Sequence, residues 1–145
     1  MEIISLTPNS PYCRDFEDDN LLSFAWISDL SGCRFNGVLV DGVLVARMAW
    51  QVNPSWCPEK DVVGIVSLET LHKFRCRGYG KVLVEYLRST FPSLSMAFEI
   101  NTPFAHHYWQ RYQPRPLGKG RGNSYLWLLP PLSKPLNQGY VKGSC

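Results

Sequence analysis

A short glycine-containing loop carries the residues best suited to chemistry in this chain. Arg75-Cys76-Arg77-Gly78-Tyr79-Gly80 lies between an apolar run, residues 62–68, and a helix-like run that begins at Lys81. Glycines let neighbouring backbone N–H groups converge on one point, and the positive end of the following helix attracts an anion. That helix has no acid before Glu85. The loop therefore predicts a cradle for a pyrophosphate group, to which the basic side chains could add charge-assisted contacts.

Two common nucleotide-binding motifs fail on spacing at this loop. A phosphate loop of the Walker type needs Gly-Lys followed by Ser or Thr, whereas Gly80-Lys81 is followed by Val82. A dinucleotide-binding fingerprint needs its third glycine at the position of Leu83, and it follows a strand nearer the start of the chain. The spacing therefore argues against a nucleoside triphosphatase and against a dinucleotide-binding fold.

The loop resembles the acetyl-CoA loop of the GNAT N-acetyltransferase superfamily, whose pattern is Arg or Gln, two residues, Gly, one residue, then Gly or Ala. Arg75, Gly78 and Gly80 match every constrained place. A separate match is the family's Asn after the fifth strand with a Tyr seven residues later, a spacing that Asn101 and Tyr108 keep. The resemblance covers about residues 35–130. It implies an acyl-CoA-dependent N-acyltransferase that moves acetyl from acetyl-CoA to a primary amine.

The resemblance also implies which residues hold acetyl-CoA, without a metal ion. The strand end before the loop would pair with the pantetheine arm as an added strand does, through Leu68, Glu69 and Thr70. The loop would bind the pyrophosphate through Arg75, Cys76, Arg77, Gly78, Tyr79, Gly80 and Lys81. Asn101 completes the residues expected on the cofactor side. The alternative is a merely tight strand-to-helix turn with solvated basic side chains.

Acyl transfer to an amine needs a base, a polarised thioester carbonyl and a proton for the departing thiolate. The resemblance assigns the proton donor to Tyr108 and the polarising N–H to the strand near Thr70. Glu99 resembles a strand glutamate that acts as base in some members, although the gap to the tyrosine is about three residues shorter here. Other candidate bases are Glu69, His72, His106, His107 and a chain of waters.

Charge is unevenly divided along the chain and bears on the acceptor. Residues 1–62 carry a net charge of −5 and residues 63–145 carry +8. The acidic segment with Asp15, Glu17, Asp18 and Asp19 would favour a cationic amine, on a small molecule or a protein. The basic loop with Arg115, Lys119 and Arg121 would favour an anionic or nucleic-acid acceptor. Each such charge cluster is more often a solvated face, so neither decides the acceptor.

A binding protein without catalysis is the alternative function. It would be a silent relative that senses CoA, or a nucleic-acid module that uses the basic second half and exposed aromatic side chains, namely Trp109, Tyr112 and Tyr125. Thioester consumption would separate the enzyme from either binder.

The elements that must position these residues can be read from periodicity and turn signals. Asp41-Gly42 joins two β-branched runs and predicts a tight hairpin over residues 38–45, whose second strand runs on towards residue 52. Thr102-Pro103 predicts a helix start. Further strands are expected over 2–6, 62–71, 95–100 and 124–129. Helices are expected over 14–30 and 81–91, and the helix that starts at Thr102-Pro103 should end at about residue 112. A basic turn is expected over 118–122. The order predicts an α/β (α+β) fold, a GNAT-like mixed, mostly antiparallel sheet flanked by helices.

Length and cysteine content bear on the number of domains and on the cell compartment. With 145 residues, a single domain over 1–130 and an irregular tail over 131–145 are expected. The five cysteines are scattered with no metal-binding spacing, which predicts neither a disulfide framework nor a zinc site and favours the cytoplasm. No apolar run approaches the roughly 20 residues of a membrane span. Nothing in the sequence indicates an oligomeric state.

Overall fold

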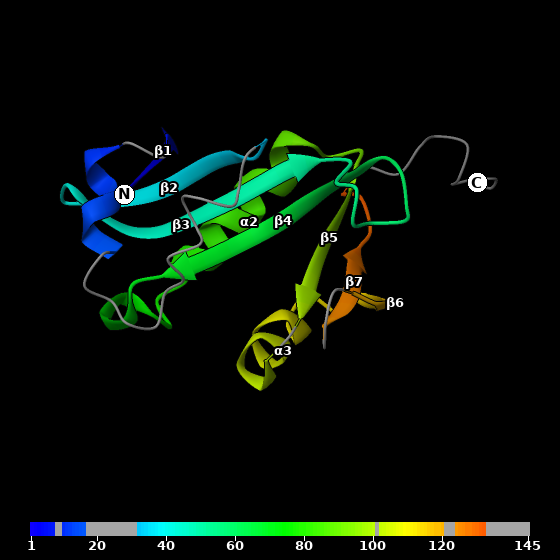
Figure 1. Cartoon of the computed structure of the whole chain (residues 1–145). Coiled ribbons are helices and arrows are strands. Elements are labelled where there is room, and N and C mark those ends of the chain that lie inside the picture. Colours follow the sequence, from blue (N-terminus) through cyan, green and yellow to red (C-terminus); the bar gives the residue numbers. More distant parts are fainter. Residues whose placement is uncertain (8–9, 17–31, 101, 121–123, 133–145) are drawn as a thin grey trace. The chain divides into compact units, whose positions relative to one another are not determined.

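A computed structural model describes residues 1–7, 10–16, 32–100, 102–120 and 124–132 (Figure 1). The strands are β1 (Glu2–Leu6), β2 (Arg34–Val40), β3 (Val43–Val52), β4 (Val62–Thr70), β5 (Ser95–Ile100), β6 (Arg115–Lys119) and β7 (Tyr125–Leu129). The helices are α2 (Tyr79–Thr90) and α3 (Pro103–Gln110), with short 3-10 turns η1 (Pro11–Phe16) and η2 (His72–Phe74).

The strands form one seven-stranded sheet in the order β1-β2-β3-β4-β5-β7-β6. The β1–β2, β2–β3, β5–β7 and β6–β7 pairs are antiparallel. The predicted mixed, mostly antiparallel sheet with helices is thus confirmed. The chain forms two compact units, one of residues 1–51 and 65–87 and the other of residues 52–64 and 88–145. The single domain expected over 1–130 stays a prediction.

The hairpin at Asp41-Gly42 has the predicted turn. Both residues have positive φ angles, 51° and 80°. These are the conformations that a two-residue hairpin turn with the native strand twist requires, and Asp and Gly adopt them at little cost. In the first unit this turn aligns β2 with β3. Just after β4, Leu71 donates its N–H to the carbonyl of Val45 on β3 at 2.9 Å.

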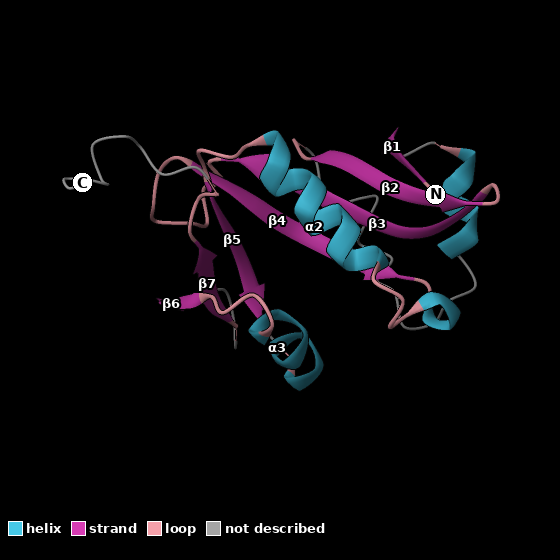
Figure 2. Ribbon diagram, turned by 180° about the vertical axis from the view of Figure 1, so that it is seen from behind, coloured by secondary structure: helices cyan, strands magenta, loops and turns pink. Residues whose placement is uncertain are grey.

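Helix α2 runs along β3 and β4 on one face of these strands (Figure 2). It begins at Tyr79, two residues before the predicted start, so the last two residues of the glycine loop belong to its first turn. Its buried side chains are Leu83, Val84 and Leu87, whereas Tyr86, expected on the apolar side, is 36% exposed. A second apolar cluster of this unit joins η1 to the sheet through Leu6, Phe16, Leu39, Leu44 and Leu71.

The second unit contains β5, β6, β7 and α3. Cys57, Val62, Ala97 and Leu128 form one of its apolar clusters. Thr102 caps α3 as predicted, because its hydroxyl accepts the N–H of Ala105 at 3.1 Å and Pro103 follows. The helix ends at Gln110, two residues before the expected end, and Gln113 then takes a left-handed φ of 54°.

Strand β6 was not predicted from the sequence. Pro116 and Gly118 indicated a turn, because proline cannot donate a hydrogen bond and glycine weakens a strand. The strand nevertheless forms at the edge of the sheet, where only β7 pairs with it and a missing N–H costs little. The register shifts between Pro116 and Gly118, as an edge strand with a bulge allows.

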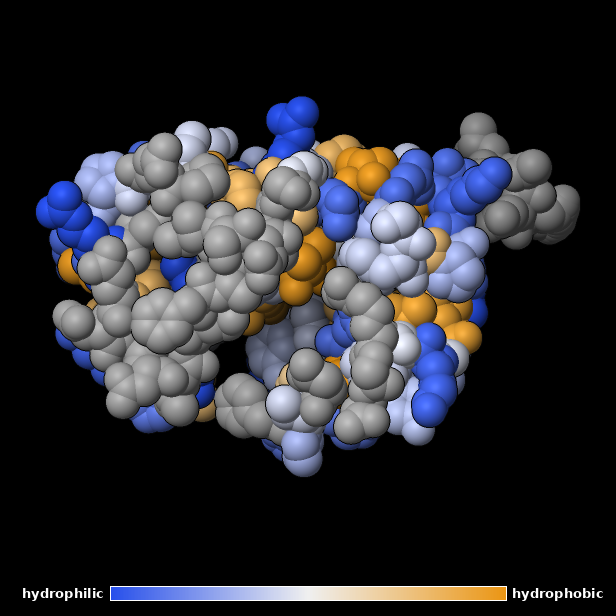
Figure 3. Space-filling model, viewed as in Figure 1, coloured by the Kyte–Doolittle hydropathy of each residue, from blue (hydrophilic) through white to orange (hydrophobic). Residues whose placement is uncertain are grey.

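Several expectations lie outside the described residues. Most of the helical segment predicted over 14–30 lies outside them, although Arg14 to Phe16 belong to η1. Asn101, residues 121–123 and the tail from 133 also lie outside the described residues. None of the helices in the described ranges combines the length and apolar character that a membrane crossing requires. Hydrophilic and apolar residues are interspersed over the described part of one face (Figure 3).

Candidate active site

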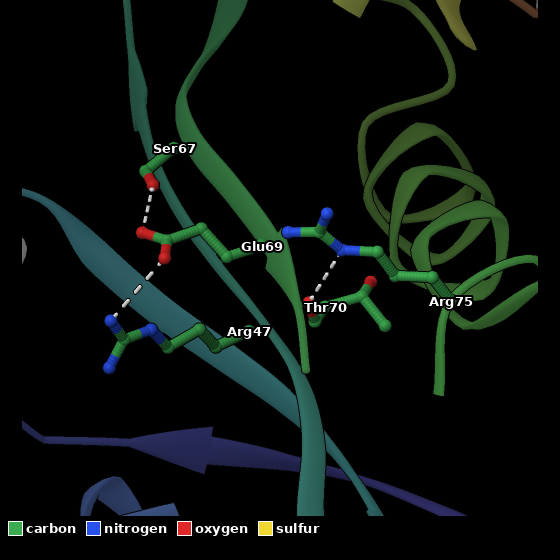
Figure 4. Close-up of polar contacts among 5 residues, drawn as sticks. All are labelled: Arg47, Ser67, Glu69, Thr70 and Arg75. Carbon is green, nitrogen blue, oxygen red and sulfur yellow. Dashed lines mark hydrogen bonds and ion pairs between the residues drawn. The ribbon is translucent and has the colours of Figure 1, made fainter. Parts of the chain in front are cut away.

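The glycine loop is tied to the end of β4. The guanidinium Nε of Arg75 donates to the carbonyl oxygen of Thr70 at 3.2 Å (Figure 4). Phe74 and Arg75 donate their N–H groups to the carbonyls of Leu71 and His72, which closes the η2 turn between strand and loop. The structure therefore brings together the strand end and the loop that the sequence assigned to the cofactor. It also gives Arg75 a bracing contact to the backbone.

Backbone conformation turns the loop into α2. Cys76 and Gly78 have left-handed φ angles of 64° and 87°, and the N–H of Val82 already bonds to the carbonyl of Gly78 at 3.0 Å. The first N–H groups of a helix have no acceptor within the helix and point outward along its axis. The first turn of α2 contains no acid. The loop thus ends in an anion-attracting helix terminus, as predicted.

Gly78→Ala is expected to lower the free energy of unfolding by about 1 kcal/mol, because its φ angle disfavours any Cβ although the space around it is open. Urea denaturation measures this loss. Gly78→Asn is the matched control and should lose less, since asparagine tolerates left-handed backbone. Equal stability of the alanine variant and the parent would contradict the backbone argument.

Two cations gather on one aromatic ring beside the loop. The Lys73 ammonium and the Arg77 guanidinium each lie 5.4 Å from the ring centroid of Phe74. Tyr79 meets the same ring edge-on, with 6.4 Å between centroids. Lys73 and Phe74 were not singled out in the sequence, although a base two residues before Arg75 was a usable signal. This cluster adds positive charge next to the predicted pyrophosphate position.

Glu69 is half of a buried ion pair. Its Oε2 lies 3.6 Å from Nη2 of Arg47 on β3, and their side chains are 12% and 5% exposed. Its Oε1 accepts from the hydroxyl of Ser67 at 3.0 Å, and the Arg47 guanidinium lies 4.2 Å from the centroid of the Phe16 ring. Figure 4 shows Glu69 and Arg75 on opposite sides of β4. Alternation along the strand therefore directs Glu69 away from the loop.

In the second unit, Glu99 is packed against the start of β7. Its Oε2 accepts from the hydroxyl of Ser124 at 2.5 Å. A Cβ on Gly120 would lie 2.5 Å from Ser124 Oγ and 2.8 Å from that same oxygen, so any other residue there would require these two side chains to shift. The neighbouring Phe98 stacks on Trp109 of α3, with ring centroids 3.8 Å apart. Because neighbouring strand residues face opposite sides, Glu99 leaves β5 on the side away from Trp109.

Tyr108 lies half-buried on α3 within an aromatic group. Its hydroxyl oxygen is 3.1 Å from that of Tyr112, and its ring meets Trp109 edge-on at 5.2 Å. The Arg111 guanidinium lies 4.7 Å from its ring centroid, while Arg111 Nε donates to the Tyr108 carbonyl at 3.1 Å. Neither the Tyr112 contact nor the Arg47 pairing was foreseen. The only signals were a second tyrosine four residues on and one arginine within an apolar strand.

Two features of the nucleic-acid alternative are not supported. Trp109, expected as an exposed aromatic, is 5% exposed because it packs on Phe98, and Tyr112 is only half-exposed. The charge of Arg115 is engaged by Glu59, whose Oε2 lies 3.1 Å from its Nη2. Of the named aromatics, Tyr125 is exposed as expected. The acidic Asp15 accepts the N–H of Leu44 at 2.7 Å.

Free thiols and potential metal ligands both occur within the described ranges. Cys33, Cys57 and Cys76 are free thiols, and burial raises the pKa of the Cys33 thiol. Within those ranges, His, Cys, Asp and Glu side chains form no group of three or more that could hold a metal ion.

Solved structures share this fold at low sequence identity. An N-acetyltransferase of Bacillus subtilis in complex with coenzyme A is 19% identical, with a TM-score of 0.67, over 90% of this chain and 96% of that one. The ribosomal-protein-S18-alanine N-acetyltransferase of Escherichia coli is 16% identical, with a TM-score of 0.68, over 96% and 98%. An acetyltransferase of Thermus thermophilus is 14% identical, with a TM-score of 0.69, over 89% and 96%.

Sequence comparison gives the family. Among curated proteins, no sequence relative matches the chain. The sequence profile described as "Acetyltransferase (GNAT) family" matches residues 1–113, which is most of the 145 residues and includes the glycine loop, both candidate glutamates and Tyr108. The fold and the loop geometry agree with that match, and the chain belongs to the acetyltransferase (GNAT) family.

Proposed function

We propose that this protein transfers the acetyl group of acetyl-CoA to a primary amine, with the Arg75–Gly80 loop as the pyrophosphate site. The observation that carries the proposal is the loop itself, left-handed at Cys76 and Gly78 and continuous with the first turn of α2. Backbone N–H groups at a helix start bind phosphate oxygens without any side chain. Arg77 and Lys81, both exposed, and the nearby Lys73 supply neutralising charge.

The strand end before the loop fits the pantetheine arm in this proposal. Leu68, Glu69 and Thr70 are backbone partners, as in the addition of a strand, so their side chains need not contact the cofactor. Arg75 holds this strand end through the Thr70 carbonyl. Asn101 and Tyr79 remain proposed cofactor contacts. The donor site thereby uses chiefly backbone groups, which hold fixed positions and need no side-chain ordering on binding.

The proposed chemistry uses Tyr108 as the acid and Glu99 as the base. Tyr108 donates its hydroxyl proton to the sulfur of CoA as the thioester bond to the acetyl carbon breaks. Glu99 takes the proton that the amine loses as the new C–N bond forms. The hydroxyl of Ser124 donates to Oε2 of Glu99 and orients the carboxylate. No metal ion takes part in these steps as proposed.

The acceptor is proposed to be a primary amine on a small molecule or on a protein. The amine must be neutral to attack, so the acceptor, which is cationic in solution, releases one proton to solvent before the attack, and Glu99 takes the second proton as the C–N bond forms. The Escherichia coli structural neighbour acts, by its name, on an alanine of a ribosomal protein. A panel for this chain should therefore include peptides with free N-termini as well as diamines and aminoglycosides.

Gly80→Glu tests the donor site. A carboxylate in the first turn of α2 stabilises the helix terminus in the free protein but repels bound phosphates. We therefore expect normal thermal stability with at least a tenfold loss of acetyl-CoA affinity by calorimetry, since about 1.4 kcal/mol is tenfold. Ser89→Glu adds the same charge about 14 Å along the helix and is the control.

An assay of the wild-type protein tests the proposed function. Release of the CoA thiol from acetyl-CoA, measured against the amine panel, should depend on the amine. Absence of acetyl-CoA binding, together with no effect of Gly80→Glu, would remove both the donor site and the activity. Binding without thiol release for any amine would leave a CoA-binding protein.

A further inference from the structure

The hydroxyl groups of Tyr108 and Tyr112 form a pair that the proposed mechanism does not yet use. Their oxygens lie 3.1 Å apart and their ring centroids 5.9 Å apart, with Tyr108 in α3 and Tyr112 two residues beyond its end. Both hydroxyls are part-buried, where a hydrogen bond is stronger than in water. Either oxygen can be the donor in this contact, so the direction of the bond depends on what the other proton does.

We infer that Tyr112 is a positioning residue for the reaction: its hydroxyl donates to Tyr108, which leaves the Tyr108 proton directed at the sulfur of CoA. A phenol has one proton, so Tyr108 can give it to the departing thiolate only if it accepts in the tyrosine pair. The inference rests on the proposed acetyl transfer for its functional meaning. Tyr112 lies four residues after Tyr108, and no part of the family resemblance refers to it.

Rigid surroundings hold the pair. The Trp109 ring lies 5.2 Å from that of Tyr108 and 5.4 Å from that of Tyr112, and Trp109 itself is buried against Phe98. Large aromatic side chains in such contact have few rotamers available. Packing of the rings therefore fixes the distance between the two hydroxyl groups.

The pair matters most after proton transfer. When the S–H bond of CoA forms and the O–H bond of Tyr108 breaks, Tyr108 becomes a phenolate, and the neutral bond from Tyr112 becomes charge-assisted and stronger. Arg111 is an ionisable neighbour of the pair, and its positive charge, 4.7 Å from the Tyr108 ring centroid, favours the same phenolate. The proton that the base removed from the amine restores Tyr108 through solvent, which balances the cycle.

Tyr112→Phe removes only the donating hydroxyl and keeps the ring. We expect kcat for acetyl transfer to fall about tenfold, the size of a charge-assisted hydrogen bond, with KM for acetyl-CoA unchanged. The alkaline limb of the kcat profile should move to higher pH, because the phenolate of Tyr108 has lost a stabilising donor. The acid limb, set by the base, should not move. Tyr125→Phe, at an exposed position on β7, is the matched control.

Two further measurements separate this role from packing and from the proposed activity. In the Tyr108→Phe background, Tyr112→Phe should have no additional effect on kcat; an undiminished tenfold loss there would overturn the inference. NMR of isotope-labelled tyrosine in the free protein should show that Tyr108 titrates at higher pH in Tyr112→Phe. An unchanged Tyr108 titration would overturn the inference even if the wild-type enzyme is active. A shifted titration in a protein without turnover would instead count against the activity alone.

Discussion

Tyr108→Phe is expected to lower kcat for acetyl transfer by about 100-fold, the usual lower end for loss of a general acid, while acetyl-CoA binds with nearly unchanged affinity. The phenyl ring keeps the contacts with Trp109 and Arg111, so the substitution removes only the hydroxyl, which is both the proton donor and the partner of Tyr112. Without a donor the thiolate must leave unprotonated, which raises the barrier to its departure. Steady-state kinetics with the best amine, and calorimetry with acetyl-CoA, measure the two quantities separately.

Acyl donors with a more acidic leaving-group thiol provide a further control. An acyl donor whose thiol ionises more readily than CoA should depend less on Tyr108, because its thiolate leaves without a proton. Equal losses of kcat and of acetyl-CoA affinity in Tyr108→Phe would assign the tyrosine to binding and end its proposed role as acid.

Arg47→Met is expected to lower the free energy of unfolding by about 3 kcal/mol, because it leaves the Glu69 carboxylate without its buried ionic partner. The two side chains are only 5% and 12% exposed, so water cannot fully replace the guanidinium. The Arg47 side chain also packs on Phe16, which joins η1 to β3 in the first unit. Urea denaturation followed by circular dichroism measures the loss.

Two matched variants identify the cause. Arg47→Met combined with Glu69→Leu should recover most of the stability, because removing both charges also removes the cost of burying one alone. Arg115→Met breaks an ion pair whose side chains are 60% and 39% exposed, and it should cost less than about 1 kcal/mol. A single variant Arg47→Met as stable as the parent would show that the pair adds nothing.

Elements that depend on neighbouring residues were predicted well from the sequence. Asp41-Gly42 adopts the positive φ angles that its residue types favour, and Thr102-Pro103 starts a capped helix. The strands over 2–6 and 95–100 have the predicted bounds. The loop from Arg75 to Gly80 lies at the predicted junction of strand and helix. In each case the signal and the structure it predicts lie within a few residues.

Elements whose stability comes from distant partners were not predicted. Strand β6 exists because β7 pairs with it, and its own Pro116 and Gly118 argue locally for a turn. Helix α2 buries Val84 rather than Tyr86, because the sheet beneath it decides which residues face inward. Trp109 was expected at the surface and is instead stacked on Phe98 of another element.

The sequence by itself therefore determined the family resemblance, the glycine loop and the order of the elements around it, since motif spacing and turn chemistry are local properties of the chain. Only the tertiary structure decided which side chains meet. It paired Arg47 with Glu69, gave Glu99 a partner in Ser124, and set the hydroxyl of Tyr112 beside that of Tyr108. Such contacts depend on strand register and on the face that each residue presents, and neither is encoded within a short window of sequence.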